Sequence, residues 1–132
     1  MIPTPYRKYR NVKTPYDGRI FDSKAECNRY IYLKALEKKG DISNLECQKK
    51  FILIPTQREP DIIGVRGGHK PGALIFPEIS YRADFVYYDN RTKQFVVEDV
   101  KGMKTPEYKL KAAMMLYLHH IRIKEIVKGR ER

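Results

Sequence analysis

The sequence predicts one α/β domain, with the element order αβββαβ and a mixed central sheet between helices. Helical and strand patterns interleave along the chain, which is typical of a sheet covered by helices. Two β-rich runs, 81–88 and 94–100, flank the polar turn 89–93, as in an antiparallel hairpin. The chain has 132 residues, 42% of them hydrophobic, which is enough for one modest core. We expect the domain to span residues 20–127.

Start and stop signals define two helices. Ser23 followed by Glu26 fits a capping box, and Gly40 fits a C-terminal stop, so the first helix runs from about residue 23 to 39. Thr105 and Pro106 are an N-cap and a first helical residue, and they predict a second helix over 106–119. Besides the hairpin runs, strands are expected at 46–55 and 121–127.

Three segments fit no regular element. Residues 1–19 combine basic and aromatic side chains with prolines, and we expect a basic N-terminal arm there. Residues 56–80 are rich in glycine and proline, which predicts a long loop with room for a small hairpin. Residues 128–132 are expected to form a basic, frayed tail.

The charge balance points to a polyanionic partner. Lys and Arg number 27 and Asp and Glu 16, so the formal net charge is +11. A merely solvated basic surface is the alternative. No apolar run approaches the roughly 18–20 residues that span a membrane, so no membrane association is expected. The N-terminal residues lack an apolar signal core, so we expect a cytoplasmic protein, with Cys27 and Cys47 as free thiols.

Acidic and basic side chains gather on the predicted hairpin. Asp84 lies in its first run, and Asp99 and Lys101 lie near the end of the second. Strand side chains alternate between faces, so Asp99 and Lys101 share one face and Glu98 takes the other. If Asp84 shares the face of Asp99, two carboxylates and an ammonium group converge, because paired strands lie only about 4.8 Å apart. The alternative is an exposed Asp99–Lys101 ion pair worth under about 1 kcal/mol.

Asp84, followed by Asp99-Val100-Lys101 within this element order, resembles the PD-(D/E)XK nuclease superfamily. The segments FDSKAECNRYIYL, YRADFVY and VVEDVKG look more closely like a small phage-encoded family, first catalogued as a domain of unknown function, over residues 20–126. The chain is also distantly similar to phage endonuclease I-type Holliday junction resolvases. This resemblance implies a restriction-endonuclease-like core. Ala83 stands where the superfamily has proline, and the Pro60-Asp61 dipeptide lies in the predicted loop rather than on the hairpin.

The resemblance also implies roles for particular residues. Asp84 and Asp99 match the metal-binding acids, Lys101 matches the catalytic lysine, and Glu26 matches a glutamate that several branches add to the site. The Val100 carbonyl is an oxygen that the family often adds. Mg²⁺, with Mn²⁺ as substitute, prefers such oxygen ligands. The implied activity is endonucleolytic hydrolysis of DNA phosphodiester bonds. In its more specific form, the resemblance implies a homodimer that cuts branched DNA during phage recombination.

Several alternatives remain open at this point. Glu98 rivals Asp99 as a ligand, because a β-bulge would exchange their faces. Glu26 has a sufficient role as a helix cap. The chain also fits a non-catalytic nucleic-acid-binding module, or a protein that binds an acidic partner. Five basic residues are candidate contacts to DNA: Lys104, Lys111, Arg66, Lys70 and Arg82. The alternative for each is a solvated surface residue without a role in binding.

Overall fold

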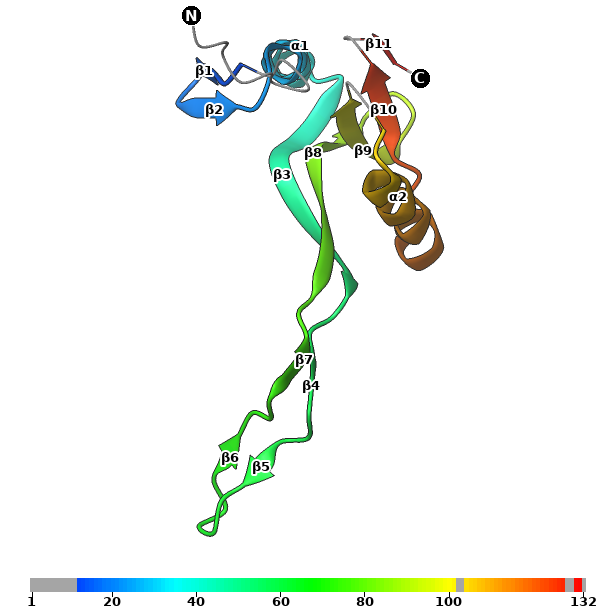
Figure 1. Cartoon of the computed structure of the whole chain (residues 1–132). Helices are drawn as coiled ribbons and strands as arrows, with labels where there is room; N and C mark the ends of the chain where they lie inside the picture. The colour runs from blue at the N-terminus through cyan, green and yellow to red at the C-terminus, as the bar shows by residue number, and fades with distance from the viewer. Residues whose placement is uncertain (1–11, 102–103, 128–129, 132) are drawn as a thin grey trace, which may run out of the picture.

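The computed structural model describes residues 12–101, 104–127 and 130–131. At its centre is a five-stranded mixed sheet in the order β11-β10-β9-β8-β3 (Figure 1). Strands β9 and β10 are parallel, and the other neighbours are antiparallel. The strand bounds are β3 Ile42–Ile54, β8 Ile79–Asp89, β9 Gln94–Lys101, β10 Lys124–Val127 and β11 Arg130–Glu131. The predicted α/β fold with a mixed sheet is confirmed.

Two helices, α1 Lys24–Lys39 and α2 Pro106–His119, have the predicted caps. The Ser23 hydroxyl accepts the Glu26 N–H at 3.1 Å, and Gly40 ends α1 in the left-handed conformation that glycine adopts without strain. The Thr105 hydroxyl accepts the Tyr108 N–H at 3.1 Å. Within the described residues, no helix is long and apolar enough to cross a membrane.

The helices cover opposite faces of the sheet. Neighbouring strand residues point to opposite faces, and Phe85 and Val86 belong to different clusters of buried side chains. Phe85 packs in the cluster that contains Tyr30 of α1, whereas Val86 packs in the cluster that contains Met115 of α2. The sheet is therefore buried on both faces, and any polar group within it needs a partner.

The structure corrects the predicted ends of the domain. Strands β1 Thr14–Tyr16 and β2 Arg19–Phe21 form an antiparallel ribbon within the predicted arm. The Tyr30 hydroxyl of α1 donates to Asp17 between these strands at 2.7 Å. Residues 1–11 of the predicted arm lie outside the described residues. In the predicted frayed tail, β11 pairs with β10, and residues 128–129 and 132 are not described.

Residues 56–80, predicted as a long loop with room for a small hairpin, do carry a short hairpin at residues 62–70, but they are more regular than a loop. The β3–β8 hairpin continues outward through two further strand pairs and projects far from the rest of the domain (Figure 1). We call residues 55–78 the β-arm. A Cβ at Gly72 would lie 2.1 Å from the Glu59 carbonyl oxygen, so only glycine fits where these two strands of the β-arm approach each other. The strands are too short to show a periodic pattern: β4 Gln57–Arg58, β5 Ile62–Ile63, β6 His69–Lys70 and β7 Leu74–Phe76.

Candidate functional site

Asp84 lies where the pairing of β8 with β9 stops. The ladder runs from Asp89 opposite Gln94 to Phe85 opposite Glu98, and Asp84 is the next residue of β8. Its Oδ2 accepts the backbone N–H of Val100 at 2.8 Å. A carboxylate thus takes the place of a backbone acceptor between the two strands. It lies directly beside the Asp99-Val100-Lys101 segment, as the hairpin argument predicts.

Gln48 of β3 joins Asp84 to the first helix. Its side-chain nitrogen donates to Glu26 Oε1 at 3.1 Å and to Asp84 Oδ1 at 3.2 Å. Gln48 has a φ of 58°, which is uncommon for a residue other than glycine in a strand. One amide therefore holds two carboxylates from α1 and β8 together. The Glu26 backbone N–H serves the helix cap, while its side chain accepts from Gln48.

Asp99 lies close enough to Asp84 for its charge to help raise the pKa of that carboxyl. The printed β8–β9 pairing ends at Phe85 opposite Glu98, and face alternation in β8 is interrupted next to Asp84, because Ala83 packs in the same cluster as Val86. Asp99 is buried, and it accepts a hydrogen bond from the Tyr81 hydroxyl. Burial, followed by the charge of Asp99, raises the pKa of Tyr81, so the phenol stays protonated as a donor.

The carboxylates perturb one another. Burial, then the charge of Asp99, then that of Glu26 raise the pKa of Asp84 to about 8. The hydrogen bonds from Val100 and Gln48 oppose this effect. The pKa of Glu26 is also raised, by burial first and then by the charges of Asp22 and Asp99. Burial and the mutual repulsion of these carboxylates therefore favour their protonated forms, and both pKa shifts have the same direction.

Glu98 belongs to the opposite side of the sheet. Its carboxylate is fully buried and forms a two-point ion pair with Arg29 of α1, while the Tyr87 hydroxyl donates to the same group. No bulge interrupts the register between β8 and β9 over residues 85–89 and 94–98. Asp99, and not Glu98, therefore lies beside Asp84.

A second polar cluster adjoins Asp99 on the neighbouring strand. Glu125 of β10 lies in register with Asp99, and parallel partners share a face. The Tyr108 hydroxyl donates to Glu125 at 2.8 Å, and the Lys104 ammonium group forms an ion pair with it at 2.8 Å. Burial, then the hydrogen bond to Glu125, raises the pKa of Tyr108.

Sequence reasoning missed three of these residues, Gln48, Tyr81 and Glu125. The predicted strand 46–55 contains Gln48, but nothing in its spacing marks it as a partner of Glu26. Tyr81 and Glu125 are ordinary strand residues until the register with β9 is known. Only information on which positions pair with each other across the sheet would have identified these three residues.

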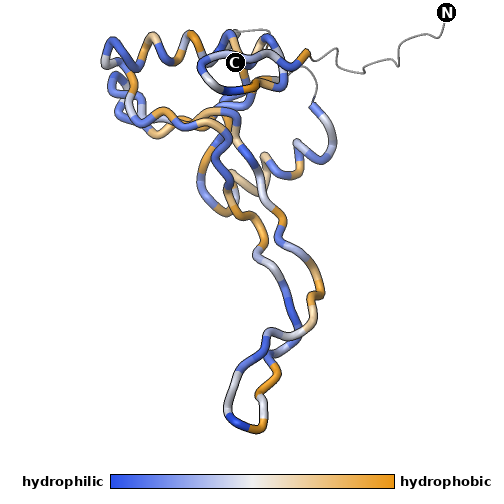
Figure 2. The backbone as a smooth tube through the Cα atoms, turned by 90° about the vertical axis from the view of Figure 1, so that its left-hand side faces the viewer, coloured by the Kyte–Doolittle hydropathy of each residue, from blue (hydrophilic) through white to orange (hydrophobic). Residues whose placement is uncertain are grey.

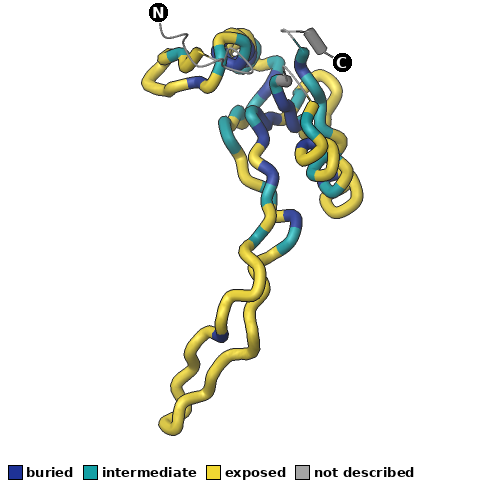
Figure 3. The backbone as a smooth tube through the Cα atoms, in the orientation of Figure 1, coloured by how far each residue is buried: buried dark blue, intermediate teal, exposed yellow. Residues whose placement is uncertain are grey.

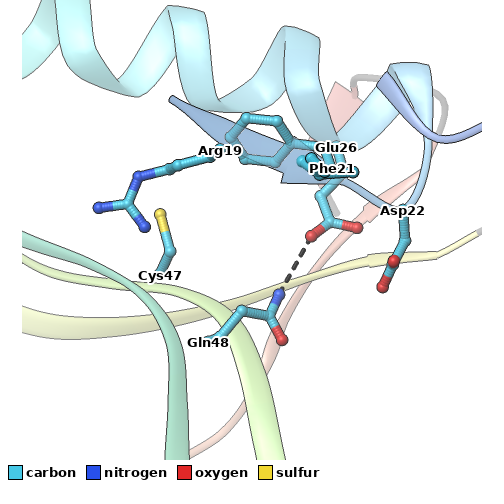
Figure 4. A pocket seen from close by; sticks show the side chains of 7 residues that line it. Arg19, Phe21, Asp22, Glu26, Cys47 and Gln48 are labelled. Carbon is cyan, nitrogen blue, oxygen red and sulfur yellow. Dashed lines mark hydrogen bonds between the residues drawn. The ribbon is translucent and has the colours of Figure 1, made fainter. Parts of the chain in front are cut away.

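A pocket of about 230 Å³ opens beside this site, between β2, the start of α1 and β3. Arg19, Asp22, Glu26, Cys47 and Gln48 line it, and Figure 4 shows the Glu26 carboxylate facing the Gln48 amide across it. Burial is the main cause that raises the pKa of the Cys47 thiol, so the thiol stays protonated. Glu26 therefore lines this pocket together with the cationic Arg19 and the acidic Asp22.

The other predicted residues are dispersed. Lys101 ends β9 and its backbone pairs with Val127, but its side chain lies outside the described structure. Arg82 donates to the Gln48 carbonyl at 3.0 Å, close to the site. Lys104 and Lys111 form ion pairs with glutamates, whereas Arg66 and Lys70 lie at the far end of the β-arm. The structure therefore does not gather the five candidate DNA contacts on one surface.

The described residues contain no preformed group of three His, Cys, Asp or Glu side chains that could hold a metal ion. Fold and site together define an α/β protein with coupled carboxylates at a junction of strands. A family model described as "Protein of unknown function (DUF1064)" matches residues 6–130, and the chain belongs to this family. No curated protein and no solved structure matches it.

Proposed function

We propose that the protein is a metal-dependent endonuclease that hydrolyses phosphodiester bonds of DNA, in the cytoplasm of a phage-infected or bacterial cell. One observation carries this proposal. The Asp84 carboxylate is held by the Val100 N–H in the gap between β8 and β9, within electrostatic reach of Asp99, and the Gln48 amide bridges it to Glu26. Carboxylates placed in this way repel one another unless a proton or a cation lies between them.

The donor set fits a hard divalent cation. Asp84, Asp99 and Glu26 supply carboxylate oxygens, the ligands that Mg²⁺ and Mn²⁺ prefer. Burial first, and then neighbouring carboxylates, raise the pKa of Asp84 and Glu26, and a bound cation would oppose the second of these causes. The described residues hold no preformed three-ligand group, so these three carboxylates would have to draw together around the ion, with the Val100 carbonyl as a further oxygen. The ion, when bound, neutralises charge on a phosphate and lowers the pKa of a coordinated water.

The remaining roles fall to other side chains. Lys101 follows Asp99 by two residues in β9, and we assign to it the stabilisation of charge on the phosphate oxygens. Tyr81 fixes the Asp99 carboxylate through its hydroxyl, and Gln48 fixes Glu26 and Asp84. A rigid arrangement of charged groups is what hydrolysis of a resistant, negatively charged ester requires.

DNA is the substrate that the charge favours. The formal net charge of +11 gives a long-range attraction for a polyanion. Arg82 is exposed and donates to the Gln48 carbonyl, so this candidate contact lies beside the acidic site. Selectivity for branched DNA rests on the resemblance to junction resolvases alone.

The test is a cleavage assay with linear, nicked and four-way DNA, in Mg²⁺, Mn²⁺ or EDTA. We expect cutting that requires the metal and that both Asp84→Asn and Lys101→Ala abolish, while circular dichroism shows an unchanged fold. The matched controls are Asp61→Asn and Lys109→Ala, which make the same chemical changes at exposed positions away from the site. Both controls should cut like the unmodified protein.

Two results would contradict the proposal. DNA binding that survives Asp84→Asn and Lys101→Ala, with no cutting by the unmodified protein in either metal, would identify a non-catalytic binding module. Absence of DNA binding even at low salt would point instead to an acidic protein partner.

A further inference from the structure

The β-arm ends in a tight turn with an apolar and a cationic side chain at its outermost point. The Gly67 N–H donates to the Gly64 carbonyl oxygen at 2.9 Å, so Val65 and Arg66 are the two central residues of a β-turn. Val65 is fully exposed, and Arg66 is exposed beside it. Figure 3 shows the arm almost entirely at the surface. The end of the arm therefore presents an uncovered apolar group next to a guanidinium group.

Apolar and basic side chains are also paired across the last two strands, β5 and β6. The two residues of β5 face the two residues of β6: Ile62 lies opposite Lys70, and Ile63 opposite His69. Residues directly opposite each other share a face, and successive residues point to opposite faces. Each face of the ribbon therefore has an exposed isoleucine beside a basic side chain. Figure 2 shows hydrophobic and hydrophilic residues next to each other at this end of the arm.

Formal charge separates the end of the β-arm from its stem. We call residues 62–71 the arm tip; they contain two cations, Arg66 and Lys70, and no acid, so their formal charge is +2. The stem, residues 55–61 and 72–78, has a formal charge of −2, from Arg58 against Glu59, Asp61 and Glu78. Phosphate groups attract the first charge and repel the second. A polyanion should therefore contact the arm tip rather than the stem.

The shape of the arm tip suits a groove of duplex DNA. A two-stranded β-ribbon is narrow enough to lie in a DNA groove. Proteins that kink DNA place arginine or lysine in the minor groove and insert an apolar side chain between neighbouring base pairs there. Val65 and Arg66 supply these two groups. Binding to a lipid surface scales with the apolar area that is buried, and a single turn offers little.

We propose that the arm tip enters the minor groove of duplex DNA, where Val65 inserts between two base pairs and kinks the duplex. Arg66 and Lys70 are among the predicted DNA contacts, and the kink is a further function that the exposed apolar residue between them adds. The β-arm projects far from the rest of the domain, so this contact lies apart from the acidic site (Figure 1). The inference rests on DNA as the partner in the proposed function, but it does not depend on cleavage.

The test measures distortion of DNA in EDTA, where metal-dependent cutting does not interfere. The probe is a duplex of about 20 base pairs with a dye at each end, which is longer than the reach of the arm, at most about 40 Å from residue 54 to residue 65. Energy transfer between the dyes reports kinking, and permanganate oxidation of thymines reports unstacked base pairs. At saturation, the unmodified protein should raise both signals above those of free DNA.

Removal of the apolar group should abolish the distortion. Val65→Ser should lose most of both signals, because serine is too short and too polar to hold two base pairs apart. Its fold should be unchanged, since Val65 is fully exposed, and circular dichroism verifies this. The matched control is Val12→Ser, which makes the same change at an exposed position outside the arm. This control should distort DNA like the unmodified protein.

The salt dependence of binding tests the cation at the turn. Arg66→Ala should reduce the slope of the logarithm of the binding constant against the logarithm of salt concentration by about 0.9, because one phosphate contact is lost. Arg66→Lys keeps the charge and should restore the slope. An unchanged slope in Arg66→Ala would remove this residue from the contact and contradict the arrangement.

Three further results would overturn the proposal. The first is DNA that is bound by the unmodified protein but not distorted; if that protein still cuts DNA in Mg²⁺, the proposed function stands and only this inference fails. The second is distortion by Val65→Ser equal to that by the unmodified protein. The third is absence of DNA binding even at low salt, which would overturn the inference and the proposed function together. Binding to vesicles of anionic lipid that Val65→Ser abolishes would then identify a lipid surface as the ligand.

Discussion

The Arg29 guanidinium and the Glu98 carboxylate form a buried two-point ion pair, with Nε–Oε1 at 2.8 Å and Nη2–Oε2 at 2.6 Å. Glu98 thereby joins α1 to the sheet, while the adjacent Asp99 points to the other face and accepts a hydrogen bond from Tyr81. Two neighbouring acids thus have different roles, one in the fold and one in the candidate site.

Removing either partner of this pair should destabilise the fold. Glu98→Ala or Arg29→Ala leaves an uncompensated buried charge, which costs about 3–5 kcal/mol of unfolding free energy. The double variant Arg29→Met with Glu98→Met should recover most of that loss, because no buried charge remains. Urea denaturation measures the effect. Lys50→Ala is the control, because its ion pair with Glu78 is partly exposed and worth under about 1 kcal/mol.

The raised pKa of Asp84 predicts a dependence of stability on pH. The native carboxyl keeps its proton up to about pH 8, whereas the unfolded one releases it near 3.8. Its contribution to stability is therefore present below the unfolded pKa and is lost as pH rises through the folded pKa. In EDTA, the free energy of unfolding should fall between about pH 4 and pH 8, less steeply in Asp84→Asn. Equal slopes in both proteins would contradict the assignment.

Divalent ions should reverse this loss, if the proposed function holds. An ion that binds deprotonated Asp84 competes with the proton, so its apparent affinity should rise with pH up to about 8. At an ion concentration tenfold above the dissociation constant, stabilisation is about 1.4 kcal/mol. Thermal unfolding with added Mg²⁺ or Mn²⁺ measures it, and Asp84→Asn should respond much less. The control variant Asp61→Asn, which carries its substitution on the β-arm, should respond like the unmodified protein.

Two substitutions of Gln48 should separate the effect of backbone strain on stability from that of the side-chain hydrogen bonds. Gln48→Ala loses both donated hydrogen bonds but keeps a Cβ at a φ of 58°, so we expect a loss of about 2–3 kcal/mol from the hydrogen bonds alone. Gln48→Gly loses the same bonds without the strain of that Cβ and should be less destabilised. Denaturation curves measure both. If the glycine variant were the less stable one, the left-handed conformation at this position would not be the source of strain.

The Tyr81 hydroxyl should contribute more to the free energy of unfolding in the absence of a bound cation than in its presence. Tyr81→Phe removes the hydroxyl that donates to buried Asp99, which costs about 1–3 kcal/mol. If a cation binds Asp99, added Mg²⁺ should restore part of this loss. Unfolding of Tyr81→Phe in EDTA and in Mg²⁺ gives the comparison. Tyr88→Phe, at an exposed position on the same strand, should change stability by less than about 0.5 kcal/mol in either solution.

The sequence predicts the elements that have local signals. The caps at Ser23, Gly40 and Thr105 give both helices within about a residue, because capping depends on side chains three or four positions apart. The hairpin that carries Asp84 and Asp99 follows from its two β-rich runs and the polar turn. The sequence left room for a small hairpin within 56–80, but the continuous extension of the β3–β8 hairpin was not predicted, because its strands are two or three residues long and interrupted by prolines and glycines.

The sequence by itself determined the α/β fold, the helix ends and the pairing of the strands that carry the two aspartates. Only the tertiary structure decided that Glu98 pairs with Arg29, that Gln48 joins Glu26 to Asp84, and that Tyr81 contacts Asp99. The reason is physical: caps and turns form between neighbours along the chain, whereas these partners meet only when α1 and the strands pack and register is set. The Gln48 amide is 22 residues from Glu26 and 36 from Asp84 along the chain.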